Sequence, residues 1–183
     1  MKRVLIPLAE GFEEVEAVTL IDLLRRAGVT VVSAGLQDGP VTGSHGVTLV
    51  PDTTLDAVLD GSFDMMVLPG GLPGTTHLDE DPRIHAMLKR LEGEGRYVAA
   101  ICAAPSVLAH AGLLSGKRAT SYPTCMPESL LPTMTYLEEG VVRDGRVITS
   151  RGPGTAMDFA LILCELLTSR AVRDEVEGDL MRP

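Results

Sequence analysis

The chain has 183 residues, of which 45% are hydrophobic and 22% charged, with 19 glycines and 12 prolines. This length and composition fit a single globular domain over residues 1–183 and argue against a disordered chain. The formal net charge of −9 argues against nucleic acid and anionic membranes as partners.

Short apolar runs alternate with helical patterns along the chain. In chain order, strands are expected at residues 3–9, 29–34, 64–68, 97–101, 119–121 and 147–150, with a short hairpin strand at 47–50. Helices are expected at residues 13–27, 82–91, 105–111 and 155–167, with Asp81 as an N-cap and Gly28 and Gly112 as C-terminal caps. Strand followed by helix, repeated, predicts an α/β fold with a doubly wound, mostly parallel sheet and helices on both faces.

The N-terminus predicts neither a signal peptide nor a membrane anchor. Its apolar run stops at Pro7 and is too short for a signal sequence. No apolar stretch reaches the 18 residues that a transmembrane helix requires. The three cysteines are an odd number without a secretory signal, so we expect reduced thiols and a cytoplasmic location.

Ligands of doubly wound sheets bind beyond the carboxyl ends of the strands. We therefore expect one functional rim formed by the residues that follow each predicted strand. These are residues 10–12, 69–71, Cys102, Tyr122 and residues 151–154.

Cys102 is the strongest candidate for a reactive group. It follows the predicted strand at 97–101 and precedes a predicted helix, which is the plan of a nucleophile elbow. The small residues Ala100 and Ala104 permit the tight turn, and the helix end should lower the thiol pKa from about 8.5. The alternative is a buried structural cysteine, which is how we interpret Cys164.

No histidine is placed to activate this thiol. None of the four is adjacent to Cys102, which disfavours a Cys–His hydrolase. Glu16 instead lies on the apolar side of the first helix, with Leu20, Leu23 and Ala27 within about 40° of it on a helical wheel. A buried carboxyl should have a raised pKa and, when protonated, can donate to a thiolate. The alternative is a glutamate favoured only by the helix dipole.

Backbone groups at two strand ends are candidates for anion binding. The N–H groups of Gly70, Gly71 and Ala103 could form an oxyanion site, although a simple turn explains the glycines equally well. Arg151 is a possible anion contact. The sequence has no dinucleotide or phosphate-binding glycine motif and no Cys/His cluster with metal-ligand spacing, so we expect no cofactor and no metal.

Four segments together resemble the ThiJ/PfpI superfamily, and within it the branch of DJ-one and bacterial YajL: residues 11–16, 68–71, 99–105 and 149–155. The resemblance runs from Lys2 to about Val176 in the same order. It implies a flavodoxin-like sandwich and a homodimer. It also implies a reactive Cys102 that oxidises readily to sulfinic acid and a protonated Glu16 beside it.

The resemblance implies two functions that are not exclusive. The first is a cysteine-dependent glyoxalase or deglycase that acts on methylglyoxal, glyoxal and their protein adducts through a Cys102 hemithioacetal, in protection against oxidative and carbonyl stress. The alternative is a redox-sensing chaperone that acts through oxidation of Cys102.

Three positions depart from patterns found in this superfamily. Tyr122 stands where some members carry a histidine near the cysteine, which puts a histidine base in doubt. Ala103 stands where the protease-like branch has a histidine, so protease activity is not expected. His45 replaces an arginine that reaches across the dimer in many members. Cys125, close to Tyr122, is either incidental or a resolving thiol.

Overall fold

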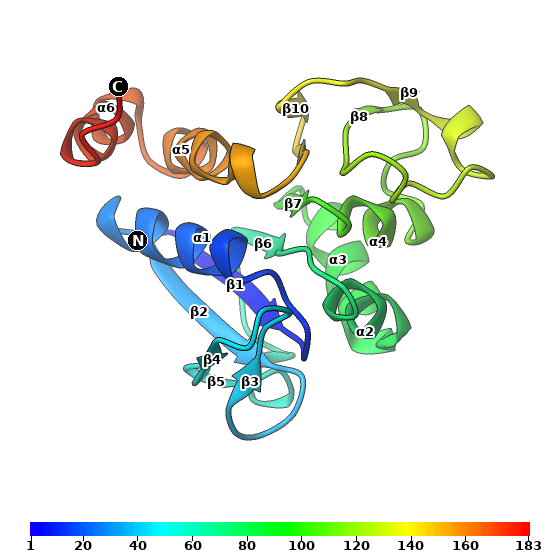
Figure 1. The fold of residues 1–183 in the computed structure, drawn as a ribbon, viewed down its shortest axis with the longest axis horizontal. Coiled ribbons are helices and arrows are strands. Elements are labelled where there is room, and N and C mark those ends of the chain that lie inside the picture. Colours follow the sequence, from blue (N-terminus) through cyan, green and yellow to red (C-terminus); the bar gives the residue numbers. More distant parts are fainter.

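A computed structural model describes residues 1–183 (Figure 1). The helices are α1 (Glu14–Arg26), α2 (Gly74–Glu80), α3 (Pro82–Gly93), α4 (Pro105–His110), α5 (Ala156–Leu167) and α6 (Arg170–Asp179). The strands are β1 (Arg3–Leu8), β2 (Thr30–Gly35), β3 (Val41–Thr42), β4 (Thr48–Leu49), β5 (Thr53–Thr54), β6 (Met65–Leu68), β7 (Tyr97–Ile101), β8 (Arg118–Ala119), β9 (Thr135–Tyr136), β10 (Val141–Asp144) and β11 (Val147–Ser150).

Seven strands form the central sheet in the order β10-β11-β7-β6-β1-β2-β5. All neighbours pair in parallel except β10, which pairs antiparallel with β11 at the edge. The strand order reverses at β1, because the chain runs from β1 to β2 on one side and then returns to β6 on the other. The predicted doubly wound, mostly parallel α/β fold is therefore confirmed.

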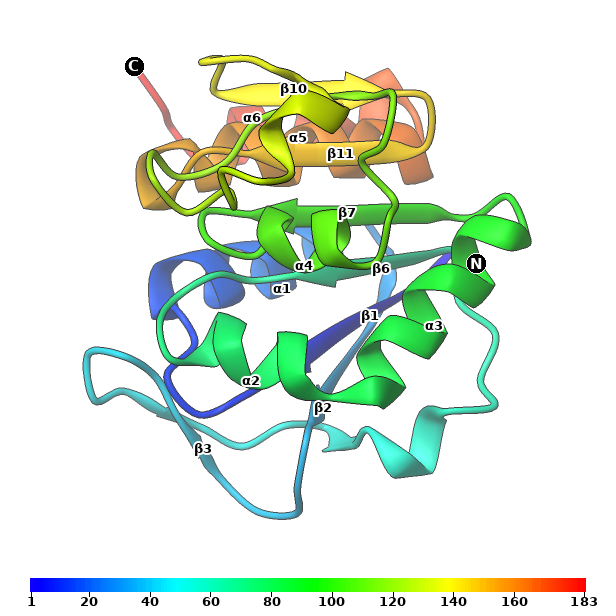
Figure 2. The ribbon, with the colours of Figure 1, turned by 90° about the vertical axis from the view of Figure 1, so that its right-hand side faces the viewer.

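Helices cover both faces of this sheet, with α2, α3 and α4 in front of it in Figure 2 and α1 and α5 behind. Each face has its own apolar core. Phe12, Leu20 and Phe159 belong to the core on the α1 and α5 side, and Leu68, Leu88 and Leu108 belong to the other. The inner strands are buried on both faces, which explains their nearly continuous apolar sequences.

The strand expected at residues 119–121 is wrong in extent and in place. Only Arg118 and Ala119 form a strand, and it pairs with β9 in a separate two-stranded sheet. Beyond it, the Thr120 N–H donates to Thr149 Oγ1 at 2.9 Å and the Tyr122 N–H to the Cys102 carbonyl at 2.8 Å. Hydrogen bonds to the Thr149 side chain and to the Cys102 carbonyl thus take the place of regular strand pairing in this segment.

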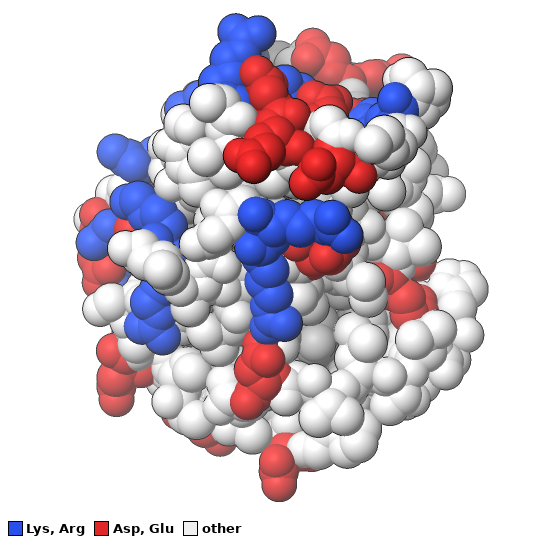
Figure 3. All heavy atoms as spheres, turned by 90° about the vertical axis from the view of Figure 1, so that its left-hand side faces the viewer, with Lys and Arg blue, Asp and Glu red and all other residues white.

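Charges of both signs mix on the surface. In the face shown in Figure 3, Lys and Arg side chains lie next to Asp and Glu side chains. Near the amino ends of β1, β6 and β7, for example, a side-chain nitrogen of Lys2 and one of Arg96 each lie 3.0 Å from Oδ1 of Asp64. None of the helices combines the length and the apolar character needed to cross a membrane.

Candidate active site

Cys102 occupies a strained turn directly after β7. Its φ is +66°, in the left-handed region that non-glycine residues seldom adopt. Two backbone hydrogen bonds hold the turn, since the Cys102 N–H donates to the Ser150 carbonyl at 3.0 Å and the Cys102 carbonyl accepts from Tyr122. The elbow predicted from the sequence is confirmed, with Ala100 and Ala104 fully buried on either side.

Two backbone N–H groups point at the Cys102 sulfur, from Gly71 and Ala103. Gly71 has a φ of +91°, and a side chain at this position would lie 2.7 Å from the carbonyl oxygen of Gly11. Only glycine therefore fits here. Both N–H groups lie where we expected an anion-binding site. Without a bound substrate, they stabilise negative charge on the Cys102 sulfur.

Glu16 lies beside the cysteine and is fully buried, as its place on the apolar face of α1 predicted. Its Oε2 accepts the Gly70 N–H at 2.8 Å, whereas Oε1 is buried without a hydrogen-bond partner. The expected role of Gly70 changes accordingly, because its N–H holds the carboxyl and is not free for an oxyanion. A Cβ at Gly70 would lie 2.6 Å from the Cys102 Cβ, so the missing side chain makes room for the pair.

Burial is the main cause of the pKa shifts in this pair. It raises the pKa of Glu16 to about 7, against the lowering effect of the Gly70 N–H and the Cys102 side chain. Burial and the Glu16 carboxylate together raise the pKa of Cys102 to about 12, while the Ala103 and Gly71 N–H groups lower it. The predicted lowering of the thiol pKa is wrong beside an ionised Glu16, because burial and like charge outweigh the N–H donors.

The two groups titrate as one pair. The pair loses one proton near pH 7 and keeps the other until about pH 12. Within that interval one proton remains on the pair, and its transfer from the Cys102 sulfur to the Glu16 carboxylate gives a thiolate beside a neutral carboxyl. The form with a neutral carboxyl and a thiolate is nucleophilic and needs no histidine base.

Glu14, two residues before Glu16, is buried at the start of α1 and faces the segment between β3 and β4. Its Oε1 accepts the His45 N–H at 2.7 Å and the Val47 N–H at 3.2 Å, so it holds the β3–β4 hairpin on α1. Burial works to raise the pKa of Glu14, but these hydrogen bonds keep it below its usual value. His45 Nδ1 lies 3.1 Å from Glu14 and 3.5 Å from Glu13, so its ring faces these carboxylates.

Ligand atoms of Glu13, Glu14 and His45 lie within 4.8 Å of one another. A metal ion could contact this group only in competition with the N–H groups that Glu14 already accepts. We therefore assign the group to hairpin anchoring.

The other predicted site residues lie at the rim with fewer contacts. The exposed Tyr122 contacts the elbow through its N–H, which donates to the Cys102 carbonyl, and a Cβ at Gly152 would lie 3.3 Å from its ring. The backbone N–H of Arg151 donates to the Gly140 carbonyl at 3.2 Å.

His110 Nδ1 lies 2.7 Å from Asp79, as expected for a histidine turned away from the cysteine. Cys125 is half-buried, and Cys164 lies in the core as predicted.

Sequence reasoning missed two supports of the elbow. The Ser150 carbonyl accepts the Cys102 N–H, and the Gly11 carbonyl accepts the Gly74 N–H at 3.2 Å behind the Gly70–Gly71 turn. Both are backbone contacts between distant segments, for which the only signal was the placement of these residues at strand ends.

Comparison with known proteins gives a consistent result. The sequence profile of the DJ-1/PfpI family matches residues 2–166. Protein DJ-1 homolog A of Arabidopsis thaliana is 45% identical over 98% of this chain, although the chain spans only 46% of that protein. The glutathione-independent glyoxalase DJR-1.2 of Caenorhabditis elegans is 40% identical over 98% of this chain and 93% of its own length. The crystal structure of Drosophila melanogaster DJ-1beta superposes with a TM-score of 0.95 at 44% identity, covering 100% of this chain and 98% of that one.

Proposed function

Because this chain belongs to the DJ-1/PfpI family, we propose that it is a cysteine-dependent glyoxalase that converts methylglyoxal or glyoxal to a 2-hydroxy acid without glutathione. The observation that carries the proposal is Cys102 on a strained turn, between two N–H donors and the buried Glu16 carboxyl. The name of the Caenorhabditis elegans relative supports the choice of reaction.

The first step is addition of the Cys102 thiolate to the aldehyde carbon. A carbon–sulfur bond forms and the carbonyl π electrons move to oxygen, which then takes the proton of the neutral Glu16 carboxyl. The product is a hemithioacetal and a Glu16 carboxylate. As charge leaves the sulfur, the Gly71 and Ala103 N–H groups become free to stabilise the developing oxyanion.

The second step is an internal redox rearrangement. The Glu16 carboxylate removes the proton from the former aldehyde carbon, and the electron pair passes through an enediolate to the neighbouring carbon, which takes that proton back from Glu16. The hydroxyl proton of the hemithioacetal passes to the oxygen of the neighbouring carbon, which leaves a thioester carbonyl beside a hydroxyl group. The carbon bonded to sulfur is oxidised and the neighbouring carbonyl carbon is reduced, so no external oxidant is needed. Water then hydrolyses the thioester to a 2-hydroxy acid and restores the thiol.

We extend the proposal to adducts of these aldehydes on proteins. Support comes from the incomplete burial of Cys102 and from the exposed side chains of Leu72 and Tyr122, which belong to the segments that contact the elbow. In a test with an adducted peptide, direct action predicts loss of the adduct faster than its spontaneous release of free aldehyde. Loss only at the rate of release would restrict the enzyme to free aldehydes.

The discriminating experiment is turnover of methylglyoxal to lactate by the purified protein. We expect activity in the wild type and in Cys125→Ser, which controls for the loss of a thiol, and none in Cys102→Ser. Absence of lactate from the wild type, or equal activity in Cys102→Ser, would overturn the enzymatic proposal.

The geometry around the sulfur also favours a second candidate, redox sensing with chaperone activity. A half-buried thiol with two N–H donors and a carboxyl beside it is suited to hold the oxygens of a sulfinic acid. Mass spectrometry after mild peroxide treatment should find sulfinate at Cys102. Protection of a client protein that depends on this oxidation would support the role, and protection equal in Cys102→Ser would contradict it.

We also propose that the protein is a homodimer. Four exposed valines lie together on α1 and the adjoining hairpin: Val15, Val18, Val47 and Val50. Such a patch on α1 and the hairpin is suited to burial against a second copy. A monomer in sedimentation at micromolar concentration would contradict this proposal.

A further inference from the structure

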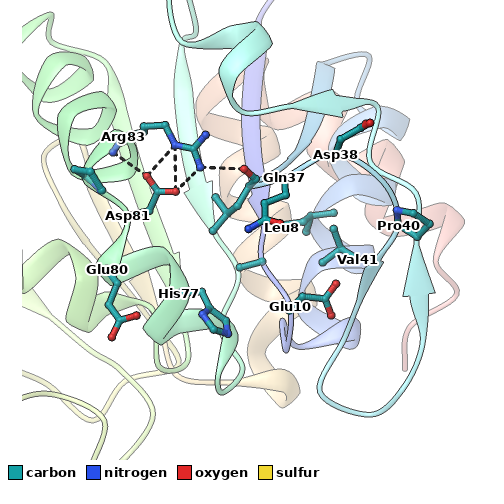
Figure 4. A pocket seen from close by; sticks show the side chains of 13 residues that line it. Leu8, Glu10, Gln37, Asp38, Pro40, Val41, His77, Glu80, Asp81 and Arg83 are labelled. Carbon is teal, nitrogen blue, oxygen red and sulfur yellow. Dashed lines mark hydrogen bonds and ion pairs between the residues drawn. The ribbon is translucent and has the colours of Figure 1, made fainter.

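A cavity of about 580 Å³ lies at the carboxyl ends of β1 and β2, and Leu8, Val41 and His77 are among its lining residues (Figure 4). Neither Cys102 nor any residue of the elbow belongs to the lining, so this cavity does not position the reactive sulfur. The Cys102 turn is instead supported by the segment between β8 and β9, which contains Tyr122.

The peptide group between Cys102 and Ala103 connects this segment to the sulfur. Its carbonyl accepts the Tyr122 N–H at 2.8 Å, and its N–H is one of the two that point at the Cys102 sulfur. Because a peptide group is planar, its carbonyl and its N–H turn together. The hydrogen bond from Tyr122 therefore fixes the direction in which the Ala103 N–H points.

Two hydroxyl groups hold Tyr122 in place. The Tyr136 hydroxyl oxygen lies 3.1 Å from Ser121 Oγ and 3.2 Å from the Ser121 carbonyl oxygen. Ser121 Oγ donates to the Tyr122 carbonyl at 2.9 Å. Since Ser121 uses its hydroxyl proton in this contact, the Tyr136 hydroxyl group is the donor to Ser121. The hydrogen bonds thus run in one direction from Tyr136 through Ser121 to Tyr122.

These hydrogen bonds are shielded from water. Ser121 is fully buried, and Tyr136 is half-buried and packs against the apolar core on the α2, α3 and α4 side. In such a place the loss of one partner leaves a polar group that water does not easily reach. At the other end of the segment, the Thr120 N–H donates to Thr149 Oγ1 at 2.9 Å. Tyr136 and Thr149 therefore hold residues 120–122 at both ends.

We propose that Tyr136 is a positioning residue for the reaction at Cys102. Through Ser121 it keeps the Tyr122 N–H on the elbow carbonyl, and the N–H of the same peptide group stays directed at the sulfur. The proposal rests on the proposed role of Cys102 as the nucleophile. Loss of the Tyr136 hydroxyl group should withdraw a donor from the sulfur and lower the share of protein that carries a thiolate.

The test is the pH profile of Cys102 alkylation by iodoacetamide, followed by mass spectrometry. Alkylation needs only the thiolate, so it tests the positioning role even if methylglyoxal is not turned over. We expect Tyr136→Phe to keep the step near pH 7, because the position of the step depends on Glu16. The height of the step should fall about fivefold, the net effect of one hydrogen bond. Tyr97→Phe should match the wild type, because Tyr97 lies at the amino end of β7.

Cys125 distinguishes positioning from a general loosening of the structure. Its N–H donates to the Tyr122 carbonyl at 3.1 Å, and its side chain is half-buried. Loosening of this segment would expose both thiols and speed the alkylation of Cys125 and Cys102 together. The positioning role predicts slower alkylation of Cys102 in Tyr136→Phe. A step of wild-type height, or faster alkylation of both cysteines, would overturn the proposal.

A double-mutant cycle tests the connection through Ser121. Ser121→Ala should lower the height of the step about as much as Tyr136→Phe, because it removes the next hydrogen bond of the same series. The variant with both substitutions should lose little more than either single variant, since residues that act through one connection are not additive. Fully additive losses, or an unchanged step in Ser121→Ala, would overturn this connection.

Discussion

The backbone N–H of Gly70 donates to Oε2 of Glu16 at 2.8 Å, joining the turn after β6 to the first helix. The hydrogen bond uses one carboxyl oxygen, and the other, Oε1, is buried without a hydrogen-bond partner. An oxygen that accepts an N–H is poorly placed to carry a proton, so the proton of the neutral carboxyl belongs on Oε1. Gly70 thereby fixes the position of the Glu16 carboxyl beside Cys102.

Substitution of Gly70 by alanine should disrupt this arrangement. The new Cβ would lie 2.6 Å from the Cys102 Cβ and 2.8 Å from Glu16 Oε2, so both side chains must move. We expect methylglyoxal turnover to fall by about 100-fold or more, since displacements near 1 Å have such effects. Gly93→Ala is the control, because nothing lies within 4 Å of its Cβ. Activity of Gly70→Ala close to that of Gly93→Ala would refute the orientation role.

Glu16→Gln should change how stability depends on pH. Since the pKa of Glu16 is raised from 4.5 to about 7, the native state of the wild type holds a proton that the unfolded state has lost between these values. Wild-type stability therefore falls as pH rises from 4.5 to 7 and changes no further through this group. The uncharged side chain of Glu16→Gln has no proton to lose in this interval. Relative to the wild type, the free energy of unfolding of the variant should therefore rise by about 3 kcal/mol between pH 4.5 and pH 7.

Chemical denaturation of both proteins at pH 4.5 and pH 8, at one protein concentration, measures this difference. Glu92→Gln, which removes an exposed carboxylate, should follow the wild type. Stability curves of Glu16→Gln and wild type that run parallel would show that Glu16 has the same pKa in both states.

Glu14→Ala should release the β3–β4 hairpin from α1. The variant leaves the N–H groups of His45 and Val47 without their acceptor, which costs about 1–3 kcal/mol. Hydrogen exchange of these two amides should accelerate, whereas amides of the inner strand β7 should exchange as before. Unchanged protection of His45 and Val47 would show that the carboxylate does not hold the hairpin.

Much of the site could be predicted because its chemistry depends on local patterns. The apolar run before Cys102 and the small residues around it identify an elbow, and the helical period places Glu16 among Leu20, Leu23 and other buried residues. The direction of the thiol pKa could not be predicted in this way. It depends on the depth of burial and on the Glu16 charge, which only the folded structure brings together.

The same distinction explains the fold. Long, periodic segments such as α1 and α5 were predicted to within two residues, because their apolar faces are regular. Helix α2 was missed, since its sequence contains glycine and two threonines and it packs mainly through Leu78. The role of Glu14 was also missed, because no local pattern reveals that a hairpin some 30 residues later contacts it.

The pH profile of Cys102 alkylation in the wild type and in Glu16→Leu tests the shared-proton pair most directly. Mass spectrometry can follow the modification of Cys102 separately from Cys125. We predict that the wild-type rate rises in a step near pH 7, when the pair loses its first proton, and that Glu16→Leu lacks this step and titrates only at alkaline pH. The same profile in both proteins would contradict the coupling of Cys102 to Glu16.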